Sequence, residues 1–143
     1  MKLAIVEDEV ILAMALALML EDWGHQVVGT ADTEAAALAL VESERPDAVL
    51  MDIGLGRKDS GLRAARVIRE ITDIPIVFCT AYADSPSIQA EVRGIDNAHL
   101  VGKPVDEERF EWLLRRIDER RREASAASPF VCVIPATLEP TST

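Results

Sequence analysis

The sequence predicts an α/β fold built on a parallel sheet. Short apolar runs of strand length alternate along the chain with longer segments of helical character. Strands separated by helices imply right-handed βαβ crossovers, which place neighbouring strands parallel to one another. Four of the apolar runs also end directly in acidic, hydroxyl or basic residues. Because parallel strands share one carboxyl edge, we expect the functional residues to meet there.

The expected elements follow one another with recognisable boundary signals. We expect strands near residues 2–6, 26–31, 47–51, 75–79 and 98–101, and helices near 9–22, 33–43, 61–71, 86–92 and 106–122. Gly24 follows the first helix as a C-cap candidate. Thr33 precedes the second helix as an N-cap candidate. Ser85 is the N-cap candidate of the fourth helix, with Pro86 at the first helical position.

The length of 143 residues corresponds to one domain with a short extension. We expect a domain over residues 1–122 and a flexible tail over 123–143, because the tail is rich in Ala, Ser, Thr and Pro. The tail contains one apolar island, at 130–134. The sequence leaves open whether this island is a partner-binding segment, a packed strand or an artefact of cloning or truncation.

The composition excludes several classes of protein. There are 25 acidic against 15 basic residues, and the net charge of -10 argues against binding to nucleic acid or to an anionic membrane. The uncharged run from Val10 to Leu20 is too short to span a bilayer, and the acids at position 7 and beyond leave no room for a signal peptide. Cys79 and Cys132 form neither a disulfide framework nor a zinc pattern, which favours a reducing cytoplasm.

Acidic residues end two of the apolar runs and predict a Mg²⁺ site. Glu7 and Asp8 follow the first run, and Asp52 closes the third. Mg²⁺ prefers oxygen ligands and is typically held by one or two carboxylates together with phosphate oxygens and water. Gly54, two residues after Asp52, offers a backbone carbonyl as a further ligand.

The remaining strand ends suit phosphoryl transfer. An aspartate such as Asp52 can act as a nucleophile and become an acyl phosphate. Lys103, after the fifth strand, would neutralise one phosphoryl oxygen, and Thr80, at the end of the fourth, would hydrogen-bond another. Catalysis of this reaction rests mainly on positioning and charge neutralisation, which these groups supply.

Four short motifs together resemble the CheY-like receiver domains of two-component response regulators. The motifs are Val6–Glu7–Asp8–Glu9, Leu50–Met51–Asp52–Ile53, Thr80–Ala81 and Lys103–Pro104, spaced by about 45, 28 and 23 residues. The resemblance covers roughly residues 1–122. It implies a doubly wound, flavodoxin-like (βα)₅ fold with a five-stranded parallel sheet of order 2-1-3-4-5.

The resemblance also assigns roles to the residues at the strand ends. It implies that Asp52 is the phosphoacceptor, that Asp8 and Glu7 bind the metal, that Thr80 is the switch hydroxyl and that Lys103 contacts the phosphoryl group. The implied phosphodonor is a histidine kinase or a histidine phosphotransferase in the cytoplasm of a bacterium. The downstream protein target stays unassigned. The implied state is a monomer or a weak dimer through the fourth helix, fifth strand and fifth helix.

The chain departs from the usual receiver pattern at the switch. Leu100 stands three residues before Lys103, where receivers usually carry Tyr or Phe. Gly61 lies nine residues after Asp52, one more than is common, and the usual Met-Pro after the phosphoacceptor is absent. The segment 75–82 instead resembles the FAT GUY subfamily of single-domain response regulators. That resemblance would move the switch aromatic to Tyr82.

The first helix is apolar nearly all round. Ile11, Ala15 and Met19, with Leu12 and Leu16, fit a stripe that faces the core. Apolar residues continue onto the other side of the helix, at Val10, Met14, Ala17 and Leu18. An exposed apolar patch usually marks a partner surface. In receivers the first helix is where histidine kinases and phosphotransferases dock, so we expect these four residues to form a docking surface rather than a merely well-covered helix.

Three functions compete. The leading hypothesis is a stand-alone phosphorylation switch without enzymatic turnover, because only about 20 residues follow the domain and leave no room for an output domain. The first alternative is a phosphohydrolase with an aspartyl-phosphate intermediate. The glycine at position 54 argues against it, because such enzymes often carry a general acid there. The second alternative is a receiver fragment of a longer regulator.

Overall fold

The structure is a computed structural model that describes the backbone of residues 1–54 and 60–137 and the side chains of residues 1–54 and 60–124. Residues 55–59 of the loop expected after Asp52, and the side chains of the island at 130–134, lie outside this description. The chain divides into two compact units, Met1–Glu107 and Glu108–Thr143. The elements are β1 (Lys2–Val6), α1 (Val10–Asp22), β2 (Gln26–Ala31), α2 (Glu34–Glu44), β3 (Ala48–Asp52), α3 (Ser60–Ile71), β4 (Ile76–Thr80), α4 (Pro86–Arg93), β5 (Ala98–Gly102) and α5 (Glu107–Thr137).

The first unit contains a five-stranded sheet of order β2-β1-β3-β4-β5. Each neighbouring pair is parallel, so all strands run in one direction and their carboxyl ends share one edge. The order expected from the resemblance, and the parallel sheet expected from the alternation of apolar runs and helices, are both confirmed.

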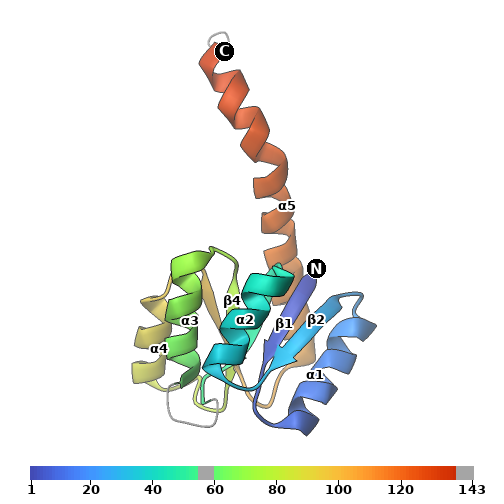
Figure 1. Ribbon diagram of the computed structural model, residues 1–143, viewed down its shortest axis with the longest axis vertical. Helices are drawn as coiled ribbons and strands as arrows, with labels where there is room; N and C mark the ends of the chain where they lie inside the picture. The colour runs from blue at the N-terminus through green and yellow to red at the C-terminus, as the bar shows by residue number, and fades with distance from the viewer. Residues whose placement is uncertain (55–59, 138–143) are drawn as a thin grey trace. The chain divides into compact units, whose positions relative to one another are not determined.

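The topology places the helices of the first unit on two faces of the sheet. The chain passes from β1 to β2 towards one edge of the sheet. It then crosses back over β1 to β3 and continues through β4 to β5 towards the other edge. Because every crossover has the same hand, α1 covers the face opposite to α2, α3 and α4. Figure 1 shows α2 and α3 side by side over the sheet, with α4 next to them.

Alternation along the strands divides the apolar core between the two faces. Ala4 and Val6 of β1 belong to a buried cluster that also contains residues of α2, α3 and α4. Leu3 and Ile5 are equally buried, and they point to the opposite face because successive strand residues alternate. The strands are therefore apolar on both sides, as expected for a sheet covered by helices on both faces.

The boundary signals act as expected at three helix ends. Gly24 has a φ of 92°, and the N–H groups of Gly24 and His25 donate to the carbonyls of Glu21 (3.0 Å) and Leu20 (3.0 Å). This pair of bonds forms a Schellman motif, in which glycine tolerates the left-handed conformation. Thr33 Oγ1 accepts from the Ala36 N–H at 3.1 Å, and Ser85 Oγ accepts from the Ile88 N–H at 3.4 Å, so both N-caps are formed.

The buried side of α1 differs from the expected one. Ile11, Leu12 and Ala15 are exposed, and the buried residues of α1 are Ala13 and Leu20. The expected core stripe is therefore wrong at these three positions. The physical reason is that residues 10–20 carry no charged or polar side chain that would mark the outer face, so several apolar stripes fit the sequence equally well.

The second unit consists of α5 and the C-terminal residues. Phe110, Leu114 and Ile117 are buried at helical spacing. On exposed turns the guanidinium of Arg116 lies 5.9 Å from the centre of the Trp112 ring. The helix continues to Thr137, so its end does not coincide with the expected end at residue 122. Among the described residues, no helix combines the length and the apolar character needed to cross a membrane.

Candidate functional site

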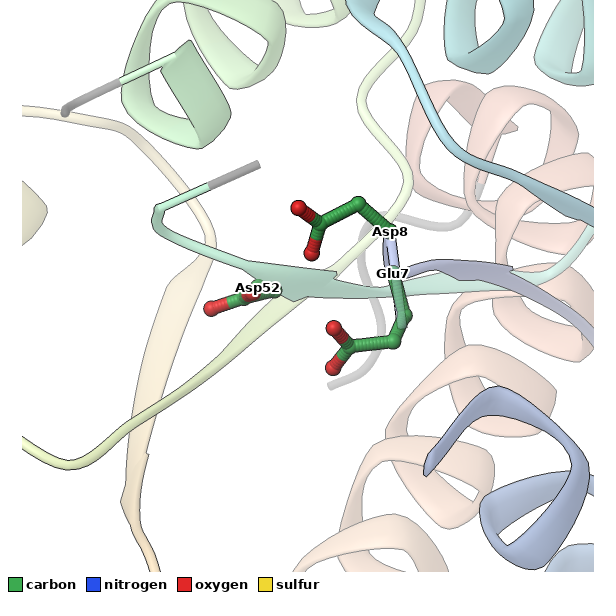
Figure 2. A group of neighbouring side chains, drawn as sticks. All are labelled: Glu7, Asp8 and Asp52. Carbon is green, nitrogen blue, oxygen red and sulfur yellow. The ribbon is translucent and has the colours of Figure 1, made fainter. Parts of the chain in front are cut away.

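Three carboxylates meet at the carboxyl edge of the sheet. Glu7 and Asp8 directly follow β1, and Asp52 is the last residue of β3, the strand beside β1. One carboxylate oxygen from each residue lies within 4.8 Å of the others. Figure 2 shows the three carboxyl groups gathered on one side of the two strand ends. Glu7 is buried, Asp52 is half-buried and Asp8 is exposed, so the group opens towards solvent through Asp8.

Lys103 brings a positive charge to these acids from the loop after β5. Its Nζ lies 3.4 Å from Glu7 Oε1 and 3.9 Å from Asp52 Oδ1. Its backbone N–H donates to the carbonyl of Thr80 at 2.8 Å, which ties the β5 end to the β4 end. The ammonium group therefore lies close to two of the acids at the shared edge, and its contact with a phosphoryl group stays a prediction.

Backbone N–H groups orient two of the carboxylates. The Glu9 N–H donates to Glu7 Oε2 at 3.2 Å. The Gly54 N–H donates to Asp52 Oδ1 at 3.3 Å. Gly54 therefore lies next to Asp52 as expected, and the role of its carbonyl as a metal ligand stays a prediction.

The switch residues lie at the ends of β4 and β5. Thr80 is buried, and its Oγ1 accepts from the Tyr82 N–H at 3.1 Å. The Tyr82 side chain is 72% exposed. Leu100 is half-buried and pairs in register with Phe78 of β4. The position that is usually aromatic is thus occupied by an aliphatic side chain. Of the two aromatic residues that lie two positions from Thr80, Phe78 is buried in the core and Tyr82 is exposed.

The electrostatics of the site favour a divalent cation. Burial raises the pKa of Glu7, and the charge of Asp52 raises it further. The Glu9 N–H and Lys103 act in the opposite direction. Three carboxylates against one ammonium leave an excess of negative charge around a buried acid. A small cation with oxygen coordination relieves this repulsion, so these residues fit Mg²⁺.

Gly61 is a positioning residue whose role the sequence analysis missed. Its N–H donates to the Ile53 carbonyl at 2.7 Å. A Cβ atom at position 61 would overlap the Asp52 carbonyl oxygen and would lie 2.7 Å from Ile53 Cα. Helix α3 therefore begins directly against the backbone that carries Asp52. The only signal in the sequence was a glycine at the junction between the loop and the helix. Its distance of nine residues from Asp52 had marked it only as a departure from the usual receiver pattern.

Cys79 is a second neighbour of Asp52 that the analysis left without a role. It pairs in register with Asp52 and is buried. Burial raises the pKa of its thiol to about 12, so the sulfur stays protonated and acts as a small apolar group beside Asp52.

A cavity of 780 Å³ connects α1 to the acidic site. Its apolar walls include Leu12, Leu16 and Met19 of α1, and Asp52 and Lys103 stand among its polar lining residues. The cavity therefore extends from the phosphoacceptor candidate along the first helix.

The predicted docking residues are mostly on the surface. Val10, Met14 and Leu18 are 70%, 60% and 68% exposed, whereas Ala17 is half-buried. Three of the four residues are therefore accessible to a partner, and Ala17 is so only in part. Whether a partner docks there stays a prediction.

Comparison with known proteins agrees with this geometry. Residues 3–115 match the family of the response regulator receiver domain. The chain is 33% identical to the phyllosphere-induced regulator PhyR of Methylorubrum extorquens over 132 residues, which are 88% of this chain and 48% of PhyR. It is 32% identical to the transcriptional regulatory protein PdtaR of Mycobacterium tuberculosis over 138 residues, which are 96% of this chain and 66% of PdtaR. The chain thus spans about half to two thirds of the length of these curated relatives.

Solved structures show the same architecture. The response regulator PhyR from Brucella abortus superposes with a TM-score of 0.74 at 35% identity, covering 87% of this chain and 51% of that one. The anti-anti-sigma factor PhyR from Bartonella quintana superposes with a TM-score of 0.77 at 31% identity, covering 89% of this chain and 51% of that one. Together, the sheet order, the acidic strand ends and these matches show that the chain belongs to the family of response regulator receiver domains.

Proposed function

We propose that Asp52 accepts a phosphoryl group from a phosphohistidine donor in the cytoplasm and that the phosphorylated chain changes a contact with another protein. The observation that carries the proposal is the placement of Lys103 between Glu7 and Asp52, within a group of three carboxylates at one sheet edge. This arrangement supplies both the nucleophile and the charges that a phosphoryl group needs.

The transfer follows from the chemistry of these residues. A carboxylate oxygen of Asp52 attacks phosphorus, the P–N bond to the donor imidazole breaks, and the histidine nitrogen keeps the electron pair. Lys103 neutralises one phosphoryl oxygen, and the Thr80 hydroxyl is placed to donate to another. Glu7, Asp8, Asp52 and the Gly54 carbonyl would hold Mg²⁺, which would supply further neutralisation of negative charge.

Thr80 and Tyr82 suit the readout of the phosphorylated state. The Thr80 hydroxyl oxygen accepts from the Tyr82 N–H, so a rotation of the Thr80 side chain toward the phosphoryl group would move this acceptor away from Tyr82. We propose that Tyr82 then moves with the loop after β4, replacing the aromatic switch that Leu100 lacks. Because Tyr82 is the single tyrosine of the chain, its ring signals in NMR report this movement directly.

The output proposed for this chain is a protein contact. The relative PhyR from Bartonella quintana has been solved as a complex with the anti-sigma factor NepR, and that structure matches this chain with a TM-score of 0.52 at 38% identity over 54% of this chain and 32% of that one. A contact of this kind with an unidentified protein is consistent with a switch that acts by changing a surface.

The test is labelling with acetyl phosphate and Mg²⁺, followed by intact mass spectrometry, with beryllofluoride as a stable mimic for NMR. We expect one phosphoryl group on the wild type and none on Asp52→Asn. The matched control is Asp47→Asn, because Asp47 immediately precedes the opposite end of the same strand. Labelling that persists in Asp52→Asn, or that is lost in a folded Asp47→Asn protein, would refute the assignment.

A further inference from the structure

The outer surface of α1 is apolar to an unusual degree. Among the described residues nine large hydrophobic side chains are exposed, and five of them lie in this one helix. The five are Val10, Ile11, Leu12, Met14 and Leu18, with Ile11 80% exposed. Two of them, Leu12 and Leu18, also line the cavity that reaches Asp52. The apolar surface is therefore continuous with the route to the phosphoacceptor.

Acidic residues stand at both ends of this apolar surface. Asp8 and Glu9 precede α1, and Glu21 and Asp22 form its last turn; all four are exposed. The last turn of α1 carries no basic residue, so Glu21 and Asp22 lie unfavourably at the negative end of the helix dipole. The surface thus has an apolar centre and negative charge at each end.

The distribution of charge over the chain strengthens this feature. Residues 1–107 contain nineteen acids and nine bases, whereas residues 108–143 contain six of each. The whole net charge of -10 therefore belongs to the unit that carries α1. A second copy of the chain is a poor occupant of this surface, because pairing two α1 helices in either direction would bring acids against acids.

We propose that α1 selects a partner helix with an apolar stripe bracketed by Lys or Arg at both ends. This inference rests on the proposed function, because it identifies the chemistry of the phosphodonor that docks there. The apolar stripe covers the exposed side chains of α1, and the basic ends pair with Glu9 before the helix and with Glu21 and Asp22 at its end. Such charges at the rim of an interface act mainly on the rate of association and on the choice of partner.

The test uses three synthetic helical peptides as probes. The first has a leucine stripe with two lysines at each end, the second has glutamates in place of the lysines, and the third keeps the lysines but replaces the leucines by serines. Binding to the full chain is measured by isothermal titration calorimetry at about 0.1 M and about 1 M salt, where the Debye length is roughly 10 Å and 3 Å. We expect only the first peptide to bind, about tenfold more weakly at the higher salt concentration.

Charge reversal on α1 gives the matched comparison. Glu21→Lys with Asp22→Lys should weaken binding of the first peptide about tenfold, and lysines at a helix C-terminus favour the helix, so loss of folding is not the cause. The control is Glu42→Lys with Glu44→Lys, which makes the same change of charge in the last turn of α2. Circular dichroism verifies the fold of both variants.

Each outcome decides the question. Selective binding of the first peptide that falls in the α1 variant and not in the α2 variant supports the proposal. Equal binding of the lysine and glutamate peptides, binding of the serine peptide, no binding at all, or an equal loss in both variants overturns it. Labelling of the wild type by acetyl phosphate requires no docking. A chain that is labelled but does not select the basic peptide refutes this inference alone, and a chain that is not labelled refutes the proposed function.

Discussion

The helices α1 and α3 each follow a strand that ends in the acidic site, yet their outer faces are opposite in character. The outer face of α1 is apolar and uncharged from Val10 to Leu20, up to the acidic last turn. The outer face of α3 carries Arg63 and Arg66, which pair with Glu34 of α2 at 2.6 Å and with Glu91 of α4. The inner face of α3 is fully buried from its first residues, Ser60, Gly61 and Leu62.

This difference separates two tasks. Helix α3 is held on three sides, by the Asp52 backbone, by α2 and by α4, and so fixes the position of Asp52. In helix α1 only Ala13 and Leu20 are buried, and the outer face from Val10 to Leu20 is apolar. The comparison implies that changes in α3 affect the fold and the site, whereas changes on the outer face of α1 affect partners.

The largest effect should come from the contact between α3 and the Asp52 backbone. Gly61→Ala should lower the free energy of unfolding by about 3 kcal/mol, because the new methyl group overlaps backbone atoms that cannot move without displacing Asp52. Urea denaturation measures this change. The control is Gly54→Ala, since a Cβ there meets nothing within 4 Å, and we expect a loss of about 0.5 kcal/mol or less. Equal losses in the two variants would show that α3 does not depend on this close approach.

The next effect concerns α1 and should appear in function rather than in stability. Met14→Lys with Leu18→Glu should slow transfer from a phosphorylated donor protein about tenfold or more, equivalent to roughly 1.4 kcal/mol, because charges replace the apolar centre of the docking surface. The measurement is the ratio of labelling by the donor protein to labelling by acetyl phosphate.

A matched variant on α3 tests the comparison itself. Val67 and Ile71 are 40% and 50% exposed and have the same spacing as Met14 and Leu18. Val67→Glu with Ile71→Lys therefore introduces the same charges at the same spacing on the other helix. We expect the ratio of labelling by the donor protein to labelling by acetyl phosphate to match that of the wild type. A similar slowing in both variants would remove the functional distinction between the two helices.

A third effect is the titration of Glu7, which lies between β1 and α1. Since the pKa of Glu7 is raised above its ordinary value of 4.5, the folded state holds this proton more tightly than the unfolded state. The stability that this proton contributes without metal is complete below pH 4.5 and is lost as the pH rises through the raised pKa. Mg²⁺ needs the carboxylate, so its affinity should fall as the pH is lowered through the same range, by up to about tenfold per pH unit.

Calorimetric titration with Mg²⁺ at several pH values measures this dependence. Glu7→Gln should bind Mg²⁺ more weakly at neutral pH and should lose the part of the pH dependence that Glu7 causes. It should also be more stable than the wild type without metal at neutral pH, because the amide is not charged. An unchanged pH dependence in Glu7→Gln would show that another group governs metal binding.

The sequence predicted the sheet and the acidic edge because both depend on local patterns. Each strand is a short apolar run, and the residue after the run determines what lies at the carboxyl edge, so Glu7, Asp52 and Lys103 could be placed together without coordinates. The buried side of α1 could not be predicted, because an all-apolar helix has no polar stripe to orient it. The close approach of Gly61 could not be predicted either, since a contact between a helix start and a distant backbone leaves no periodic trace in the sequence.

The smallest effect should come from the outer charges of α3. Arg63→Met should lower stability by roughly 0.5 kcal/mol, because the ion pair with Glu34 is solvent-exposed on both sides. A double-mutant cycle with Glu34→Gln, followed by urea denaturation at about 0.1 M and about 1 M salt, isolates the pair energy, which should largely vanish at the higher concentration. A coupling above about 1.5 kcal/mol that resists salt would mean that charge, rather than the buried face around Gly61, holds α3 against the Asp52 backbone. Helix α3 would then differ from α1 in its outer pairs as much as in its buried contacts.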